Sequence, residues 1–188
     1  MKNNTDFSLA LIKEDKEEII KKDEIAHEQE HSIEVQLPFL QYCLKKFKIV
    51  PIVCSTQDYG KVISLSRTLV KTIKKQKNPE NFIILASSDL THYGPNYGFV
   101  PFAFDKETKK NLYALDKGII DQIIKLDSKS FFEKAKKSTV CGLSPITIAI
   151  ETSKLLGAKT CKLLKYYVSG DVVSDYQNAV GYASLIIK

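Results

Sequence analysis

The feature that most constrains the fold of this chain is the alternation of short β-branched runs with segments of helical period. Residues 48–54 and 82–86 are apolar runs of strand length, whereas residues 32–47 place apolar side chains at alternating steps of four and three. Strands separated by helices form a sheet that helices cover on both faces, so the sequence predicts an α/β fold with a mixed sheet. The remaining predicted helices are 58–75, 105–125, 128–137 and 144–157, and the closing strands are 162–169 and 179–187.

Three residues are expected to shape these helices. Pro38 should kink the first one, Gly118 should interrupt the helix over 105–125, and Asp127 should cap the next.

The length of 188 residues predicts one domain, with residues 1–30 as a charged arm or helix and residues 31–188 as the core. No apolar run approaches the roughly 18 residues of a membrane span, and the polar start lacks the order of a secretory signal. We therefore expect a cytoplasmic protein with no membrane partner. The widely spaced cysteines are expected to be reduced thiols: Cys43, Cys54, Cys141 and Cys161.

The charge pattern argues against a nucleic-acid partner. The chain has 28 basic and 22 acidic residues, but Arg67 is the only arginine. Bidentate recognition of guanine or phosphate favours the planar guanidinium of arginine, so a lysine-rich surface is expected to be a solvated face.

His92 follows Asp89 by three residues in a polar loop directly after the apolar run 82–86. Open α/β sheets place ligand sites beyond the carboxyl ends of their strands, so His92 is a candidate general acid or base that Asp89 orients. The alternative is structural, with Asp89 capping a turn and His92 an ordinary loop histidine.

Glu30 and His31 precede the amphipathic segment that begins at Ser32. The start of a helix offers backbone amides and a dipole to an anion, so these two residues are candidate binding residues. Ser32 and Glu30 are equally consistent with an ordinary helix cap. His27 lies in the charged segment, and we assign it no role.

Cys141 lies three residues before the predicted start of a helix at Ser144. The positive end of the helix dipole favours a thiolate there, which is both a nucleophile and a metal ligand. A small buried hydrophobic residue is the structural alternative. A Cys141–His92 hydrolase pair is chemically open.

Three stretches resemble the Memo family in their order and spacing: EHSIEVQLPFL (30–40), SSDLTHYG (87–94) and TVCGLSPI (139–146). The resemblance runs from about Thr5 to the final strand. It implies the fold of class III extradiol dioxygenases, an α/β sheet between helices with a non-heme metal centre at one end. It also implies membership of AmmeMemoRadiSam systems (as protein B), in which AMMECR-type and radical-SAM proteins are the companions.

Carried over residue by residue, the resemblance makes Cys141 a metal ligand, His92 an acid or base and Asp89 a neighbour in the same pocket, with His31 on the pocket side. Family members also have an amino-terminal portion in which a Pro-His-Ala-Gly-like strand end and a second histidine-bearing loop supply two imidazole ligands. This chain contains neither of these two segments. The resemblance therefore implies the carboxyl-terminal part of a Memo-like protein, with an incomplete ligand set for iron, copper or zinc.

The expected function is that of a metal-dependent oxidoreductase related to the dioxygenases. The alternatives are a non-catalytic module that binds an anion, a phosphopeptide or another protein, and the Cys–His hydrolase. Because the absent portion would supply central strands, the sequence also predicts an exposed apolar edge. A second copy or a companion amino-terminal fragment is expected to cover it.

Overall fold

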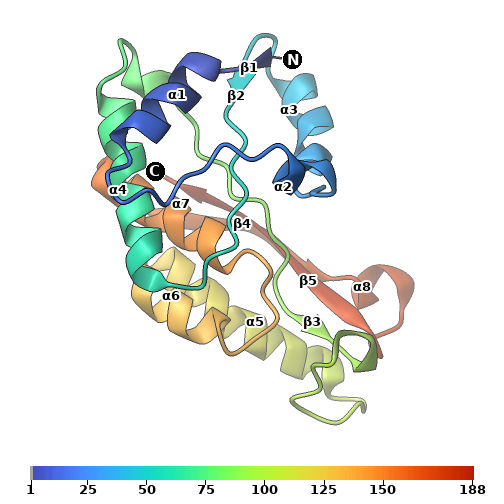
Figure 1. The fold of residues 1–188 in the computed structure, drawn as a ribbon. Coiled ribbons are helices and arrows are strands. Elements are labelled where there is room, and N and C mark those ends of the chain that lie inside the picture. The colour runs from blue at the N-terminus through green and yellow to red at the C-terminus, as the bar shows by residue number, and fades with distance from the viewer. Residues whose placement is uncertain (1) are drawn as a thin grey trace.

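The computed structural model describes residues 2–188 and has the predicted mixed α/β class (Figure 1). The helices are α1 (Thr5–Glu14), α2 (Ile25–Glu28), α3 (Leu37–Cys43), α4 (Tyr59–Lys74), α5 (Thr108–Ile124), α6 (Ser128–Ala135), α7 (Leu143–Leu155) and α8 (Gly170–Val173). The strands are β1 (Lys2–Asn3), β2 (Lys48–Ile49), β3 (His92–Tyr93), β4 (Cys161–Val168) and β5 (Ala179–Ile187). In the described part of the chain, no helix is both long and apolar enough to cross a membrane.

The main sheet is antiparallel and has the order β3-β5-β4, while β1 and β2 form a separate parallel pair. Strands β4 and β5 form a long hairpin that runs behind α7 in Figure 1. On β4, Cys161, Leu163 and Tyr166 pack on the core, whereas Leu164 and Tyr167 are exposed. The helices therefore cover the face of the hairpin from which Cys161, Leu163 and Tyr166 point.

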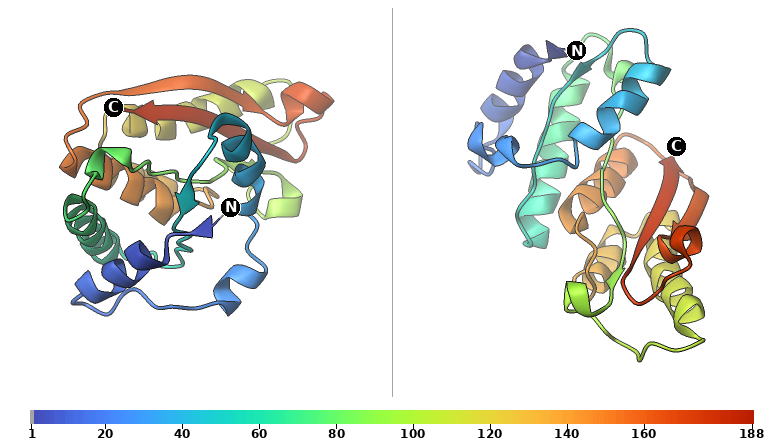
Figure 2. Two further views of the ribbon diagram at one scale, coloured as in Figure 1. Left: turned by 90° about the horizontal axis from the view of Figure 1, so that it is seen from above. Right: turned by 90° about the vertical axis from the view of Figure 1, so that its right-hand side faces the viewer.

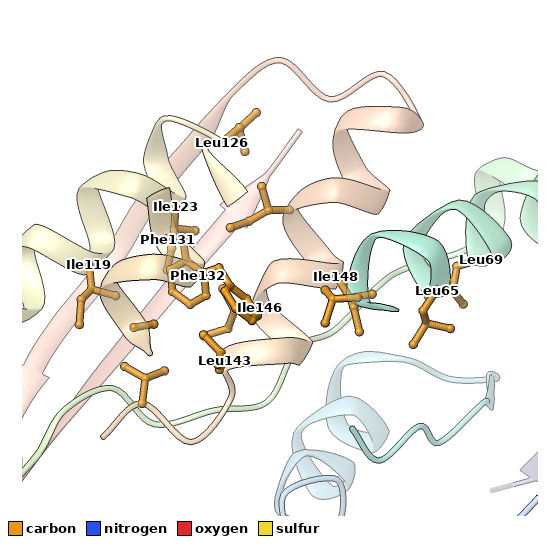
Figure 3. Close-up of a cluster of buried hydrophobic side chains, with 14 of the residues drawn as sticks. Leu65, Leu69, Ile119, Ile123, Leu126, Phe131, Phe132, Leu143, Ile146 and Ile148 are labelled. Atoms are coloured by element: carbon orange, nitrogen blue, oxygen red, sulfur yellow. The ribbon is translucent and has the colours of Figure 1, made fainter. Parts of the chain in front are cut away.

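The core lies where α4, α5, α6 and α7 pack on one another. Figure 3 shows Phe131 and Phe132 of α6 between Ile119 and Ile123 of α5 on one side and Ile146 of α7 on the other. Each fully buried side chain of this size contributes about 1.5–3 kcal/mol to folding. This packed layer is the rigid support beneath the loops that precede α7 and follow residue 86.

The charged amino-terminal segment is anchored to the core by α1. Phe7 and Leu11 of α1 are buried, and the helix packs along α4 (Figure 2). Glu14 forms ion pairs with Lys71 of α4 and with Lys75, the residue that follows this helix. Hydrogen bonds from Lys71 and then Lys75 lower the pKa of the Glu14 carboxyl to about 2. The end of α1 is thereby fixed to the second half of α4.

The helices agree well with the sequence pattern, with three differences in detail. The Asp127 side chain caps α6 by accepting the Ser130 N–H, as predicted. The expected interruption of α5 at Gly118 is wrong, because the helix continues through that residue. Helix α7 begins one residue earlier than expected and has Gly142 as its N-cap residue. At Pro38 a short 3₁₀ turn passes into α3 instead of one kinked helix.

The predicted strands over 48–54 and 82–86 form almost no ladder. Only Lys48–Ile49 pairs, as β2, and 82–86 is extended but unpaired. Within residues 2–188, no backbone-to-backbone hydrogen bond joins 50–57 or 83–89 to a neighbouring strand. The two strand predictions are therefore wrong for all but two residues, because a strand requires a partner as well as a suitable sequence.

Alternate side chains of the run 82–86 nevertheless differ in burial. Ile83 and Leu85 are 79% and 54% exposed, whereas Phe82, Ile84 and Ala86 pack on the core. This alternation is that of a strand with one face on the core and the other face uncovered.

Candidate functional site

The loops 87–94 and 139–145 meet in space, although about 50 residues separate them in the sequence. The backbone N–H of Asp89 donates to Cys141 Sγ at 3.2 Å, and the Gly142 N–H donates to Ser88 Oγ at 2.8 Å. The Ser88 hydroxyl also lies 3.5 Å from Cys141 Sγ. Two of the three Memo-like stretches therefore form one structural unit.

Gly142 is the residue that allows this approach. A Cβ atom at this position would overlap both Cβ and Oγ of Ser88, although the backbone dihedral angles of Gly142 are open to other residues. The requirement for glycine is therefore one of space and not of conformation.

His92 is held in one orientation by the backbone of Thr139. Its Nδ1 atom lies 2.9 Å from the carbonyl oxygen of Thr139. A carbonyl only accepts hydrogen bonds, so Nδ1 carries the proton in this contact and a neutral ring presents the lone pair of Nε2. Nε2 faces Asp89 Oδ2 at 3.6 Å, and the ring of Tyr97 lies edge-on to the imidazole with centroids 5.1 Å apart.

Asp89 is the residue that both of the other candidate groups contact. Its backbone N–H bonds to Cys141, and its carboxylate faces the imidazole of His92. In the described chain no hydrogen bond joins the Cys141 thiol directly to His92. The arrangement thus gathers a thiol, a carboxylate and an imidazole around one loop, with a solvent-exposed sulfur. It is not the directly hydrogen-bonded nucleophile and base of a hydrolase.

These residues do not make a complete metal site by themselves. Among residues 2–188 no three His, Cys, Asp or Glu side chains converge in the geometry that would hold a metal ion. A facial triad of the non-heme iron type needs three such ligands with open positions beside them. The donor set fits only part of a metal centre, so no metal-dependent step follows from this chain alone.

The third Memo-like stretch reaches the same loop through Gln36. Its Nε2 donates to the hydroxyl of Ser87 at 3.1 Å. His31, from the same stretch, is exposed, and no hydrogen bond or ion pair of the described residues joins it to Asp89, His92 or Cys141. The Memo-like stretch that contains His31 thus lies beside the site, while this side chain faces solvent.

Glu30 forms a local turn. Its carboxylate accepts the backbone N–H of Ser32 at 2.6 Å, and this hydrogen bond lowers the pKa of Glu30. The first helical turn begins only at Glu34, later than the predicted start at Ser32. The Glu30 carboxylate therefore occupies the backbone amide that an anion at this turn would require.

The sequence pattern missed two residues that border the site, Tyr182 and Asp116. Desolvation, followed by the charge of Asp89, raises the pKa of Tyr182 on β5. Beneath the loop, the buried Asp116 of α5 accepts hydrogen bonds from the Thr91 N–H at 3.2 Å and from the Tyr166 hydroxyl at 2.8 Å. Burial raises the pKa of this carboxyl. Neither residue stands in a recognisable motif. Each comes close to the site only through the packing of α5 and β5, which the local sequence does not reveal.

Nearly the whole chain matches known proteins in sequence. A family model described as Memo-like protein matches residues 1–186. The MEMO1 family proteins of Methanococcus vannielii and Methanosarcina mazei are 41% and 37% identical to the chain, and each alignment covers 98% of it. A MEMO1 family protein of Methanocaldococcus jannaschii is 39% identical over 91% of the chain.

The chain spans 61%, 65% and 56% of the lengths of these three relatives. The match covers nearly all of the chain and includes both loops of the site. The chain therefore belongs to the Memo-like protein family.

Proposed function

We propose that this chain contributes the thiol, carboxylate and imidazole groups of a Memo-like oxidoreductase site, and that the remaining metal ligands come from outside the chain. The observation that supports this is the position of Asp89, which bonds to Cys141 through its backbone and faces His92 through its carboxylate. A thiolate, a carboxylate and an imidazole are all ligand types of transition metals.

Each group has a distinct role in the proposal. Cys141 is the protein ligand to iron, copper or zinc, since its sulfur is exposed at the loop. His92 accepts or donates a proton at Nε2, and the Asp89 carboxylate orients the imidazole when Nε2 carries that proton. The metal, when bound, would supply Lewis-acid or redox chemistry beside this proton-transfer pair.

The missing ligands are proposed to come from a companion fragment or from a second copy of the chain. The relatives are longer than this chain, and the exposed faces of Ile83 and Leu85 border an unpaired extended segment. Unpaired backbone beside exposed apolar side chains favours pairing with another polypeptide. The proposal includes AMMECR-type and radical-SAM proteins as companions, in a cytoplasm that keeps the four cysteines reduced.

Cobalt titration tests the role of Cys141. Bound thiolate gives Co²⁺ a charge-transfer absorption in the near ultraviolet, which oxygen and nitrogen ligands do not give. Wild type, Cys141→Ser and Cys43→Ser are titrated anaerobically, because Cys43 is the other exposed thiol and serves as the matched control.

We expect saturable absorption in wild type and Cys43→Ser, and its loss in Cys141→Ser. Absorption that survives Cys141→Ser, or none with cobalt in large excess over wild type, would overturn the proposal.

A further inference from the structure

We infer that Thr139 is a positioning residue that fixes the orientation and tautomer of His92. Three contacts join the two residues. The His92 N–H donates to Thr139 Oγ1 at 2.7 Å, the Thr139 hydroxyl donates to the His92 carbonyl at 2.8 Å, and the imidazole Nδ1 meets the Thr139 carbonyl at 2.9 Å. Both the backbone and the ring of His92 are therefore held by one residue.

The place of β3 in the sheet explains why a hydroxyl is needed. The strand lies at the edge of the β3-β5-β4 sheet, and the backbone groups of His92 bond to Thr139 instead of to a further strand. A hydroxyl accepts one hydrogen bond and donates another at the same time, so it satisfies both the N–H and the C=O of one residue. Serine retains this capacity, whereas valine has nearly the same shape and lacks it.

The contact between Nδ1 and the Thr139 carbonyl decides which nitrogen of the His92 imidazole carries the proton. With the Nδ1 proton directed to the Thr139 carbonyl, Nε2 of the neutral ring is an acceptor. Asp89 Oδ2 lies 3.6 Å from Nε2 and can accept a hydrogen bond from it only when Nε2 also carries a proton. Only Val140 separates Thr139 from Cys141 in the sequence, and the thiol itself is held by Asp89 and Ser88. The use of Nε2 as a proton acceptor or ligand rests on the proposed function, but the tautomer itself does not.

The experiment is ¹⁵N NMR of the histidine rings in the metal-free protein, at a pH about two units above the ordinary histidine pKa of about 6.5. The signals of His92 are assigned by their loss in His92→Gln. The variants are Thr139→Val and Thr139→Ser, with Ser138→Ala as the matched control. Ser138 is the adjacent hydroxyl residue, and its side chain bonds to Ala135 and Val140.

We expect His92 to be mainly the Nδ1–H tautomer in wild type, Thr139→Ser and Ser138→Ala. Thr139→Val keeps the backbone carbonyl that meets Nδ1 but removes both hydroxyl hydrogen bonds that hold the His92 backbone against it. The ring should then move away from that carbonyl, and the ratio of the Nδ1–H to the Nε2–H form should fall about fivefold as the ring hydrogen bond is lost. An Nε2–H tautomer in wild type, which needs no variant to fold, would overturn the inference. An unchanged ratio in a folded Thr139→Val protein would also overturn it. Neither readout depends on metal, so failure of the cobalt experiment leaves this result unaffected.

Discussion

At the scale of single residues, the site is built from contacts that sequence motifs indicate only in part. Asp89, His92 and Cys141 stand in stretches whose residue types suggest chemistry, and the structure places all three in one pair of loops. Thr139 stands in the same stretches but has no unusual chemistry of its own. Its importance lies in the backbone it contacts, which residue type alone does not reveal.

A substitution at Gly142 tests how closely the loops 87–94 and 139–145 approach each other. Gly142→Ala should lower the free energy of unfolding by about 1–3 kcal/mol, because its new methyl group overlaps Ser88 and forces the loops apart. Gly118→Ala is the matched control, since a Cβ there meets only Lys134 Nζ at 3.8 Å in the interior of α5. The control should gain about 0.5–1 kcal/mol from helix propensity. Urea denaturation measures both, and equal effects of the two substitutions would contradict the overlap.

Two buried threonines of α7 form a second matched pair. Thr147 donates its hydroxyl to the Leu143 carbonyl at 2.7 Å, whereas the buried hydroxyl of Thr152 has no partner among the described residues. Thr152→Val should therefore raise the free energy of unfolding by about 1 kcal/mol, and Thr147→Val should lower it by about the same amount. Thermal denaturation checks both. A loss of stability in Thr152→Val would show that its hydroxyl is hydrogen-bonded.

At the scale of elements, helices are more predictable than strands in this chain. The apolar period of α4 and the Asp127 cap of α6 are local signals, and both elements form where expected. The strands β4 and β5 pair with each other as a hairpin and also form nearly as predicted. The runs 48–54 and 82–86 have equally suitable residues, but apart from Lys48–Ile49 they have no neighbouring strand. A suitable local sequence was therefore not sufficient to form a strand.

Asp171 joins three elements through one carboxylate. It accepts hydrogen bonds from Lys109 and Tyr113 of α5 at 2.7 and 2.5 Å, from Tyr176 at 2.6 Å and from the Val168 N–H of β4 at 2.9 Å. Desolvation acts to raise the pKa of Asp171, but the hydrogen bonds from Lys109, Tyr113 and Tyr176 outweigh it and hold the pKa below the ordinary value of 3.8.

A carboxyl whose folded pKa is depressed stabilises the fold above its unfolded pKa, and this contribution is lost as the pH falls through the folded value. Asp171→Asn should lower the free energy of unfolding by about 1.5–3 kcal/mol at neutral pH, the range for hydrogen bonds to charged groups. It should also flatten the decline in stability below about pH 4. Urea denaturation across this pH range makes the measurement.

Asp121→Asn is the control for this prediction, because the Asp121–Lys117 pair is an exposed ion pair within α5. Such pairs contribute about 0–1 kcal/mol, so its acid profile should parallel that of wild type. An Asp171→Asn profile that also parallels wild type would contradict the assigned role.

At the scale of the whole molecule, the helical layer is well packed, while apolar side chains are uncovered on α3 and on the segment 82–86. Phe39 and Tyr42 of α3 are 71% and 93% exposed, and Ile83 and Leu85 of the unpaired segment are also exposed. The expectation of an apolar edge came from the resemblance to longer proteins. Which residues form it could not be read from the sequence, because the run 82–86 looks uniformly buried.

These side chains predict association of the isolated chain with itself or with a companion polypeptide. We expect light scattering of the purified chain to give a mass above that of a monomer, and Ile83→Asp to reduce that mass. Val172→Asp is the control, since Val172 is 74% exposed but lies on α8, which is neither α3 nor the segment 82–86. A wild-type chain that is a monodisperse monomer would contradict the prediction.

The central claim is that the loops carrying Asp89, His92 and Cys141 share one site, and a disulfide tests it most directly. The Ser88 hydroxyl lies 3.5 Å from Cys141 Sγ. In Ser88→Cys, the new thiol at position 88 should therefore form a disulfide with Cys141 under mild oxidation. Non-reducing peptide mapping identifies the bond. The control Ser87→Cys should not, because Ser87 bonds to Gln36 instead. Failure of Ser88→Cys to pair with Cys141, or equal pairing from position 87, would contradict the account.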